Sequence, residues 1–372
     1  MEKNEFGSIL IYLIMIGLLY LVGQTVITLV LKSIEAAINQ FVYILIATIA
    51  ALILFTIVYE IGHVIGAKIG KYKCIYFNLF GFCFFRDNEK WHFKFEGFDG
   101  LFSETRFAPI SNEIKSNPAH FLRGGIVSFL VSIIIGIVIF MIRSIPETIR
   151  YATLIYFAIG LVLLLYHVIP MKTDILNDGY RLKLLGSKEN AEAYNDFMRI
   201  ESNARKGISD VEYKVYENIT PMTVLINKYA YYKKLADKDF VEAERIVDVI
   251  LKSPEALDSN TVYRYRIQKL FFVIMNKSKE EASEYYWKEM NSYDRKFLAK
   301  DNYIPSRRVY LLVSGIINDS FSESKIAIEG MKKRINKMVD KVQKSVELEL
   351  YAACIEKVMV ALDSDDLIKY FN

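Results

Sequence analysis

Residues 41–68 read FVYILIATIAALILFTIVYEIGHVIGAK, a long apolar run with a carboxylate, Glu60, and an imidazole, His63, near its end. About 20 apolar residues suffice to cross a bilayer as a helix. Ionisable side chains within such a span are costly and usually functional. On a helix, Tyr59 and His63 share a face and Glu60 is adjacent. This is the geometry in which two metal ligands and a general base converge on one water. The alternative is that Glu60 and His63 are interfacial residues that reach toward water.

Three other apolar stretches are long enough to span a membrane, at about Ile9–Leu31, Ile126–Ile142 and Thr153–Met171. The first is too long for the apolar region of a typical signal peptide, so we interpret it as a retained span. The predicted fold is mainly α: residues 1–190 form a polytopic core of about four transmembrane helices with a small β element. Residues 191–372 follow as a soluble, all-α domain.

The bulk composition supports this division and excludes some functions. The chain has 24% charged residues and a net charge of +4, and its long apolar runs lie almost entirely in the first half. No basic stripe or RNA-binding signature is present, so nucleic acid is not an expected partner. The three cysteines are scattered and odd in number, which argues against a disulfide framework and fits a reducing compartment.

Lysine and arginine distribution predicts the orientation in the membrane. The segment between the second and third spans carries nine of these residues, from Lys68 to Arg123, whereas the loop between the first two spans has only Lys32. Arg143 and Arg150 lie between the last two spans and argue mildly against the orientation that the other lysines and arginines predict. By the positive-inside rule, the termini, the long middle segment and the C-terminal half are expected in the cytoplasm.

A second polar cluster follows the fourth span. His167 lies inside the apolar run, Pro170 breaks the helix, and Asp178 and Gly179 come next. Freed backbone at membrane depth is tolerated only where it is buried in protein or lines a cavity. Taken alone, the Asp-Gly pair would be a turn, and His167 would be a helix–helix hydrogen-bonding residue. Their occurrence at the ends of two spans indicates one shared polar pocket.

At these positions the chain resembles the site-2 protease family of intramembrane zinc metalloproteases. That family shows His-Glu-x-x-His at the end of one span and Asn-x-x-Pro followed by Asp-Gly at the end of a later one. Residues 59–63, YEIGH, match all but the first histidine, and residues 167–170, HVIP, match all but the asparagine. Three further features are similar to a bacterial subgroup of that family: the spacing to Asp178-Gly179, the sequence NDGYR at 177–181, and the glycine-rich helix start GGIVS at 124–128.

The resemblance implies an integral, multi-pass protein of a bacterial cell membrane with a zinc site. Carried over by position, Glu60 is the general base, and His63 and Asp178 are zinc ligands. The metal would polarise the scissile carbonyl and lower the pKa of its bound water. The implied substrate is a membrane-associated protein or peptide.

Two departures from the family pattern bear on that implication. Tyr59 stands in the first ligand position, and a neutral phenol is a poor zinc ligand. His167 stands where the family usually has asparagine, so it offers a replacement nitrogen. One hypothesis is a rearranged zinc site of His63, His167 and Asp178, with Tyr59 as a weak ligand or neighbour. The other is a decayed site that binds no metal.

The segment between the second and third spans is rich in β-forming residues. Cys74–Phe85 is too short to span as a helix, and Trp91–Gly97 alternates apolar and polar residues. We predict a hairpin or small sheet at the membrane edge. The resemblance suggests that it binds extended substrate by strand addition. A structural plug over the pocket is the alternative.

From about Ala191 onward the pattern is helical, and paired segments recur at loosely 40-residue spacing. They resemble tetratricopeptide units, with a concave face for a protein or peptide partner. An irregular helical bundle is the alternative. The predicted helical segments lie at Asn227–Ala236 with Asp239–Val247, Tyr263–Trp287, Val309–Ile335 and Ser345–Leu362.

Three functions remain open on the sequence. The leading one is an intramembrane metalloprotease that uses Glu60 and zinc. The second is a pseudoprotease that binds a membrane peptide without cutting and acts as a chaperone, immunity factor or transporter accessory. The third is a membrane anchor for the helical domain.

Overall fold

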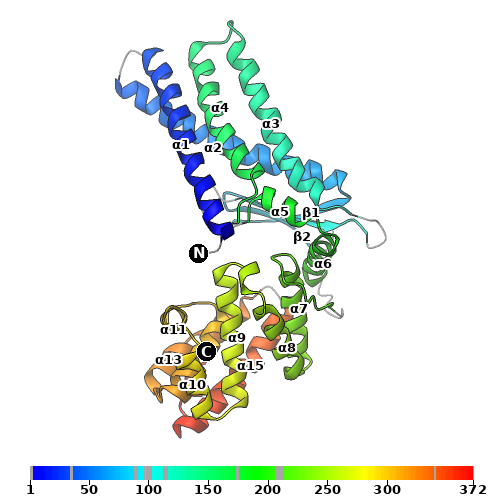
Figure 1. Ribbon diagram of the computed structural model, residues 1–372, viewed down its shortest axis with the longest axis vertical. Coiled ribbons are helices and arrows are strands. Elements are labelled where there is room, and N and C mark those ends of the chain that lie inside the picture. The colour runs from blue at the N-terminus through cyan, green and yellow to red at the C-terminus, as the bar shows by residue number, and fades with distance from the viewer. Residues whose placement is uncertain are drawn as a thin grey trace. The chain divides into compact units, whose positions relative to one another are not determined.

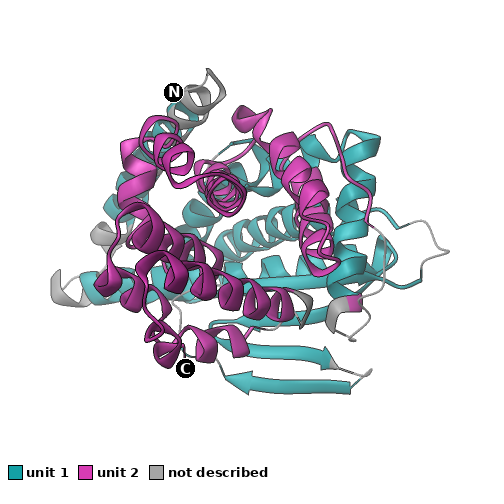
Figure 2. Cartoon of the chain, turned by 90° about the horizontal axis from the view of Figure 1, so that it is seen from below, with its two compact units in different colours: residues 1–202 teal, residues 203–372 magenta. Residues whose placement is uncertain are grey.

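The structure is a computed structural model. It describes residues 3–33, 37–87, 90–95, 97, 103–111, 116–172, 176–205, 213–338 and 341–371. It is mainly helical, with 72% helix and one small antiparallel sheet. The chain divides into two compact units, residues 1–202 and residues 203–372, coloured separately in Figure 2.

The first unit is built on apolar helices (Figure 1). Within the described residues, three helices are long and apolar enough to cross a membrane: residues Phe41–Ile69 of α2, and the whole of α3 and α4. Helix α1, which we expected to be a further span, has a shorter apolar stretch at Leu13–Leu29. The helices are α1 (Lys3–Ser33), α2 (Ala37–Ile69), α3 (Ala119–Met141) and α4 (Glu147–Val168).

Two helix ends differ from the sequence prediction. Helix α3 begins at Ala119 instead of Ile126, because Phe121 and Leu122 are buried and pack as part of the helix. Helix α4 ends at Val168 instead of Met171. Ile169 after it is extended (φ −73°, ψ 122°), as expected for a residue that precedes proline.

The predicted β element is a four-stranded antiparallel sheet in the order β3-β2-β1-β4. Phe80 and Gly81 connect the first two strands, and both have positive φ, 56° and 88°. A two-residue type I′ turn requires this, and the turn matches the twist of the strands. The edge strand β4 was not predicted. The strands are β1 (Tyr72–Leu79), β2 (Phe82–Asp87), β3 (Lys90–Phe95) and β4 (Ser103–Pro109).

The sheet contacts α2 through β1 and β4, and Phe107 of β4 is buried with Phe121 near the start of α3 (Figure 1). Helix α5 (Asp178–Leu184) follows α4, and α6 (Lys188–Arg205) continues the chain. The sequence assigned α6 to the second domain, but Met198 of this helix is buried with Tyr72 of β1 and Phe121 of α3. Because α6 packs on the first unit, that unit ends near residue 202 instead of the predicted residue 190.

The second unit is a set of short helices. Its successive helices α7 and α8, then α9 and α10, pack as the predicted hairpins. The last predicted pair, at Ser345–Leu362, is instead one continuous helix, α15. The helices are α7 (Thr223–Ala236), α8 (Phe240–Leu251), α9 (Ser259–Asn276), α10 (Lys279–Lys288), α11 (Ser292–Leu298), α12 (Ile304–Leu312), α13 (Phe321–Ile328), α14 (Met331–Asn336) and α15 (Lys341–Leu362).

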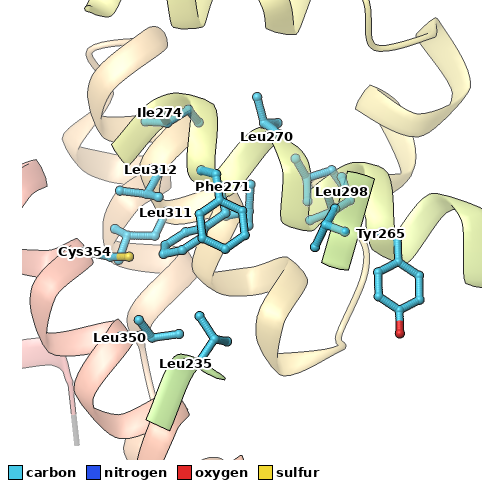
Figure 3. Close-up of a cluster of buried hydrophobic side chains, with 14 of the residues drawn as sticks. Leu235, Tyr265, Leu270, Phe271, Ile274, Leu298, Leu311, Leu312, Leu350 and Cys354 are labelled. Atoms are coloured by element: carbon cyan, nitrogen blue, oxygen red, sulfur yellow. The ribbon is translucent and has the colours of Figure 1, made fainter. Parts of the chain in front are cut away.

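Helix α15 contacts both α7 and α12. In an open repeat array each repeat contacts only its neighbours, so the contact between the first and last long helices closes this unit into a bundle. Its core includes Phe271 of α9, Leu311 of α12 and Cys354 of α15 (Figure 3), all buried.

Candidate functional site

The site forms where α2 and α3 approach most closely. A Cβ placed on Gly62 would lie 2.2 Å from Oγ of Ser128 and 2.5 Å from the carbonyl oxygen of Gly124. A Cβ on Gly125 would lie 2.7 Å from the Tyr59 ring and 2.8 Å from Nε2 of His63. Small residues let membrane helices approach this closely. The glycines therefore hold Tyr59 and His63 against α3. The recurrence of Gly62 and Gly66 four residues apart is a sequence signal that our prediction did not use.

Asn177 fixes the start of α5 and hence the position of Asp178. Its side-chain oxygen caps the helix by accepting from the backbone N–H of Tyr180, at 2.9 Å. Its amide donates to the carbonyl oxygens of Tyr166 and Ile169, the latter at 2.7 Å. These are carbonyls near the end of α4, where Pro170 lacks the N–H that would continue the helix. Asn177 thus joins the end of α4 to the start of α5.

The structure brings Tyr59, His63, His167 and Asp178 together; we call these four residues the histidine–aspartate cluster. Nε2 of His63 lies 3.6 Å from Oδ2 of Asp178, and Nδ1 of His167 lies 3.8 Å from the same oxygen. The Tyr59 hydroxyl donates to Oδ2 of Asp178 and lies 2.8 Å from Nδ1 of His167. The cluster therefore joins α2, α4 and α5.

The hydrogens in this cluster follow from the donor inventory. The Tyr59 hydroxyl has one hydrogen, and it goes to the Asp178 carboxylate, which only accepts when ionised. A hydrogen bond between Nδ1 of His167 and the Tyr59 oxygen then requires the N–H to be on Nδ1. The result is a chain in which His167 donates to Tyr59 and Tyr59 donates to Asp178. Nδ1 of His167 has no lone pair left for a metal.

His63 is oriented by a different partner. Its Nδ1 lies 2.9 Å from the carbonyl oxygen of Phe121 on α3 and must donate to it, since a carbonyl only accepts. In the neutral imidazole, Nε2 is then an acceptor. It faces the Asp178 oxygen, so two acceptor atoms point toward each other across 3.6 Å.

Glu60 is held away from the cluster. Oγ of Ser103 donates to one of its carboxylate oxygens at 2.7 Å, and the Thr105 hydroxyl donates to the other. Both residues lie on the edge strand β4. Within the described part of the chain, no hydrogen bond or ion pair joins Glu60 to His63, His167 or Asp178.

Two arginines near the cluster have different surroundings. Arg106 of β4 forms a bidentate pair with Glu104, at 2.8 and 3.2 Å, and also binds Glu201 of α6, at 3.1 Å. Arg181 lies one turn after Asp178 on α5. Burial opposes its charge, but Tyr194, Asp178 and other acidic neighbours outweigh burial and raise its pKa. Arg181 therefore places a positive charge near the Asp178 carboxylate.

The described residues do not fit the zinc site that the resemblance implies. A catalytic zinc site needs three protein ligands and an open fourth position. Within the ranges that the structure describes, no three His, Cys, Asp or Glu side chains are arranged to hold a metal ion. Nδ1 of His167 donates to Tyr59 in this arrangement, so this atom is not available as a ligand. The predicted ligands do lie together, whereas the predicted base Glu60 lies on the β4 side.

Comparisons with known proteins add no family assignment. No protein-family model matches the chain, and no curated protein or solved structure does. Ser103 and Thr105, whose hydroxyls bond to Glu60, were missed by the sequence analysis. These residues belong to no recognisable motif, and they contact Glu60 from more than 40 positions away.

Proposed function

We propose that the protein is a membrane-embedded, peptide-binding relative of the site-2 proteases that does not cut its ligand. One observation carries the proposal: the Tyr59 hydroxyl joins His167 to Asp178 by hydrogen bonds. These bonds occupy Nδ1 of His167 and one oxygen of Asp178, two of the atoms that could otherwise bind a zinc ion. This arrangement supports the pseudoprotease over the metalloprotease among our three functions.

The peptide-binding part of the proposal rests on the sheet. Strand β4 is at one end of the order β3-β2-β1-β4 and pairs only with β1 among the described strands. An exposed strand edge can accept an extended peptide through main-chain hydrogen bonds. Ser103 and Thr105 place this edge beside the end of α2, which is where the resemblance locates a substrate.

Metal content tests the first half. Full-length protein purified in detergent from zinc-supplemented cells should carry far less than one zinc per chain by mass spectrometry. Tyr59→His removes the hydroxyl and supplies an imidazole, so zinc should rise toward one per chain. One zinc per wild-type chain would overturn the proposal.

A β-forming peptide tests the second half. The probe is a dye-labelled hexapeptide of alternating threonine and valine that carries a benzophenone group. The peptide should crosslink to residues 103–111. Wild type and Glu60→Gln should both leave it uncut, because the proposed protein does not cleave its ligand. The same peptide with alternate backbone nitrogens methylated is the control, since strand addition needs backbone N–H donors. Equal crosslinking by both peptides, or crosslinks confined to residues 90–95, would contradict binding at β4.

The second candidate function is the zinc metalloprotease, and one observation favours it. His63 donates Nδ1–H to a backbone carbonyl, which is the usual orientation of a metal-ligating histidine. Its Nε2 faces Asp178 across 3.6 Å. Stoichiometric zinc in wild type that is lost in His63→Ala would favour this candidate, and loss also in His167→Ala would make His167 the third ligand.

Orientation and partners complete the proposal. The lysines and arginines between α2 and α3 support a cytoplasmic location for that segment and for the second unit. The resemblance supports a bacterial cell membrane. We assign a protein-partner role to the helical hairpins of the second unit. Because α15 packs on α7, the partner would bind an outer helix face instead of the concave face of an open tetratricopeptide array.

A further inference from the structure

The Glu60 carboxylate lies at the contact between α2 and the edge strand β4. It is 4% exposed, and each of its two oxygens accepts a hydrogen bond from a hydroxyl of that strand. Hydrogen bonds to an ionised acceptor are about twice as strong as those between neutral groups. The contact is therefore a strong link between the helix and the strand.

The spacing of the two donors makes the link specific. Ser103 and Thr105 are two residues apart, so they lie on the same face of β4. Arg106 is on the opposite face and binds Glu201 of α6, at 3.1 Å. Strand β4 is thus held from both faces by charged groups, while one of its two backbone edges pairs with β1. The other backbone edge is the one that our proposed function assigns to the peptide.

We propose that Ser103 and Thr105 are positioning residues that hold the peptide-binding edge of β4 in place through Glu60. In this role Glu60 is an anchor for the strand instead of a base toward a water at the histidine–aspartate cluster. The inference rests on the proposed function for the identity of the ligand, an extended peptide. The link itself is a property of the protein without ligand.

Backbone hydrogen exchange of the full-length, ligand-free protein in detergent tests the link. Ser103→Ala combined with Thr105→Val leaves a buried carboxylate without its two donors. Exchange of the β4 amides should then become at least about tenfold faster, because a hydrogen bond to a charged group is worth about that factor or more. Thr105→Ser keeps the hydroxyl and should retain most of the protection. Thr56→Val is the matched control, because the Thr56 hydroxyl bonds only to Leu52 within α2, at 2.9 Å.

The comparison with Glu60→Leu separates a specific link from general loosening. If the hydroxyls act through Glu60, adding Ser103→Ala and Thr105→Val to Glu60→Leu should change β4 exchange no further. Additive effects, or equal acceleration by Thr56→Val, would overturn the proposal. The double hydroxyl variant should also weaken crosslinking of the threonine–valine peptide about tenfold. Unchanged exchange together with normal peptide crosslinking would refute the link and leave peptide binding standing.

Discussion

Each unit contains a buried polar cluster, and the two differ in how far they are exposed to solvent. In the second unit, Arg308 and Glu347 are fully buried and paired, with Nε of Arg308 3.0 Å from Oε2 of Glu347. Gln268 accepts from Arg308 at 3.0 Å and from Tyr231 at 2.8 Å. The Arg308 guanidinium also lies 4.1 Å from the centre of the Phe271 ring. We call Tyr231, Gln268, Arg308 and Glu347 the arginine–glutamate cluster.

The histidine–aspartate cluster of the first unit is less completely buried. The His167 side chain is 17% exposed, and Nε2 of His63 faces an acceptor. A buried charge pair surrounded by core residues fixes how helices pack, whereas a partly exposed imidazole such as that of His167 can meet a ligand or an ion. The comparison teaches that burial of polar groups alone does not indicate function, because the arginine–glutamate cluster is the more deeply buried of the two.

The largest expected effect is in the arginine–glutamate cluster. Glu347→Leu leaves Arg308 charged and unpaired in the core, which should cost about 3–5 kcal/mol of unfolding free energy. The double variant Arg308→Met with Glu347→Leu should regain most of this loss, because no charge remains buried. Urea unfolding followed by Trp287 fluorescence, in a Trp91→Phe background of the full-length protein, measures both. A loss of unfolding free energy under about 1 kcal/mol in the single variant would show that Arg308 and Glu347 do not behave as a buried ion pair.

A smaller effect is expected where the histidine–aspartate cluster meets α3. Gly62→Ala places a methyl group 2.2 Å from Oγ of Ser128, so α2 and α3 must separate, at about 1–3 kcal/mol. Thermal unfolding in detergent should show a lower Tm. Gly23→Ala in α1 is the matched control, because nothing lies within 4 Å of its added Cβ. If both variants melt alike, the close contact does not hold the cluster.

The smallest effect is expected from Tyr59→Phe, which removes only the hydroxyl between His167 and Asp178. The loss should be about 1 kcal/mol, since the His167 side chain is 17% exposed and can bind water instead. Tyr156→Phe, which removes a hydroxyl bonded to Ser132 between α3 and α4, is the control for a bond outside the cluster. Thermal unfolding measures stability, and zinc analysis of the same samples asks whether the vacated space admits a metal. A stability loss as large as that of Glu347→Leu would erase the contrast between the two clusters.

The sequence by itself determined the apolar helices, the break at Pro170, the β segment and the residues that gather in the cluster. These follow from local patterns: the length of an apolar run, a ring that removes an N–H, and alternation along a strand. It placed Glu60 next to Tyr59 on α2, and the structure agrees. It did not find β4, because a short polar segment carries little periodicity. It assigned α6 to the second domain, because the periodicity of a helix does not say which unit its apolar face packs on.

Only the tertiary structure decided which atoms meet. Tyr59 reaches Asp178 across 119 positions, and Glu60 reaches Ser103 across 43. One step along α2 turns a side chain by about 100°, so neighbours in the sequence face different elements. Tyr59 therefore faces the histidine–aspartate cluster while Glu60 faces β4. A motif supplies the side chains, and the packing of α2 against α3, α5 and the sheet determines which bonds each one makes.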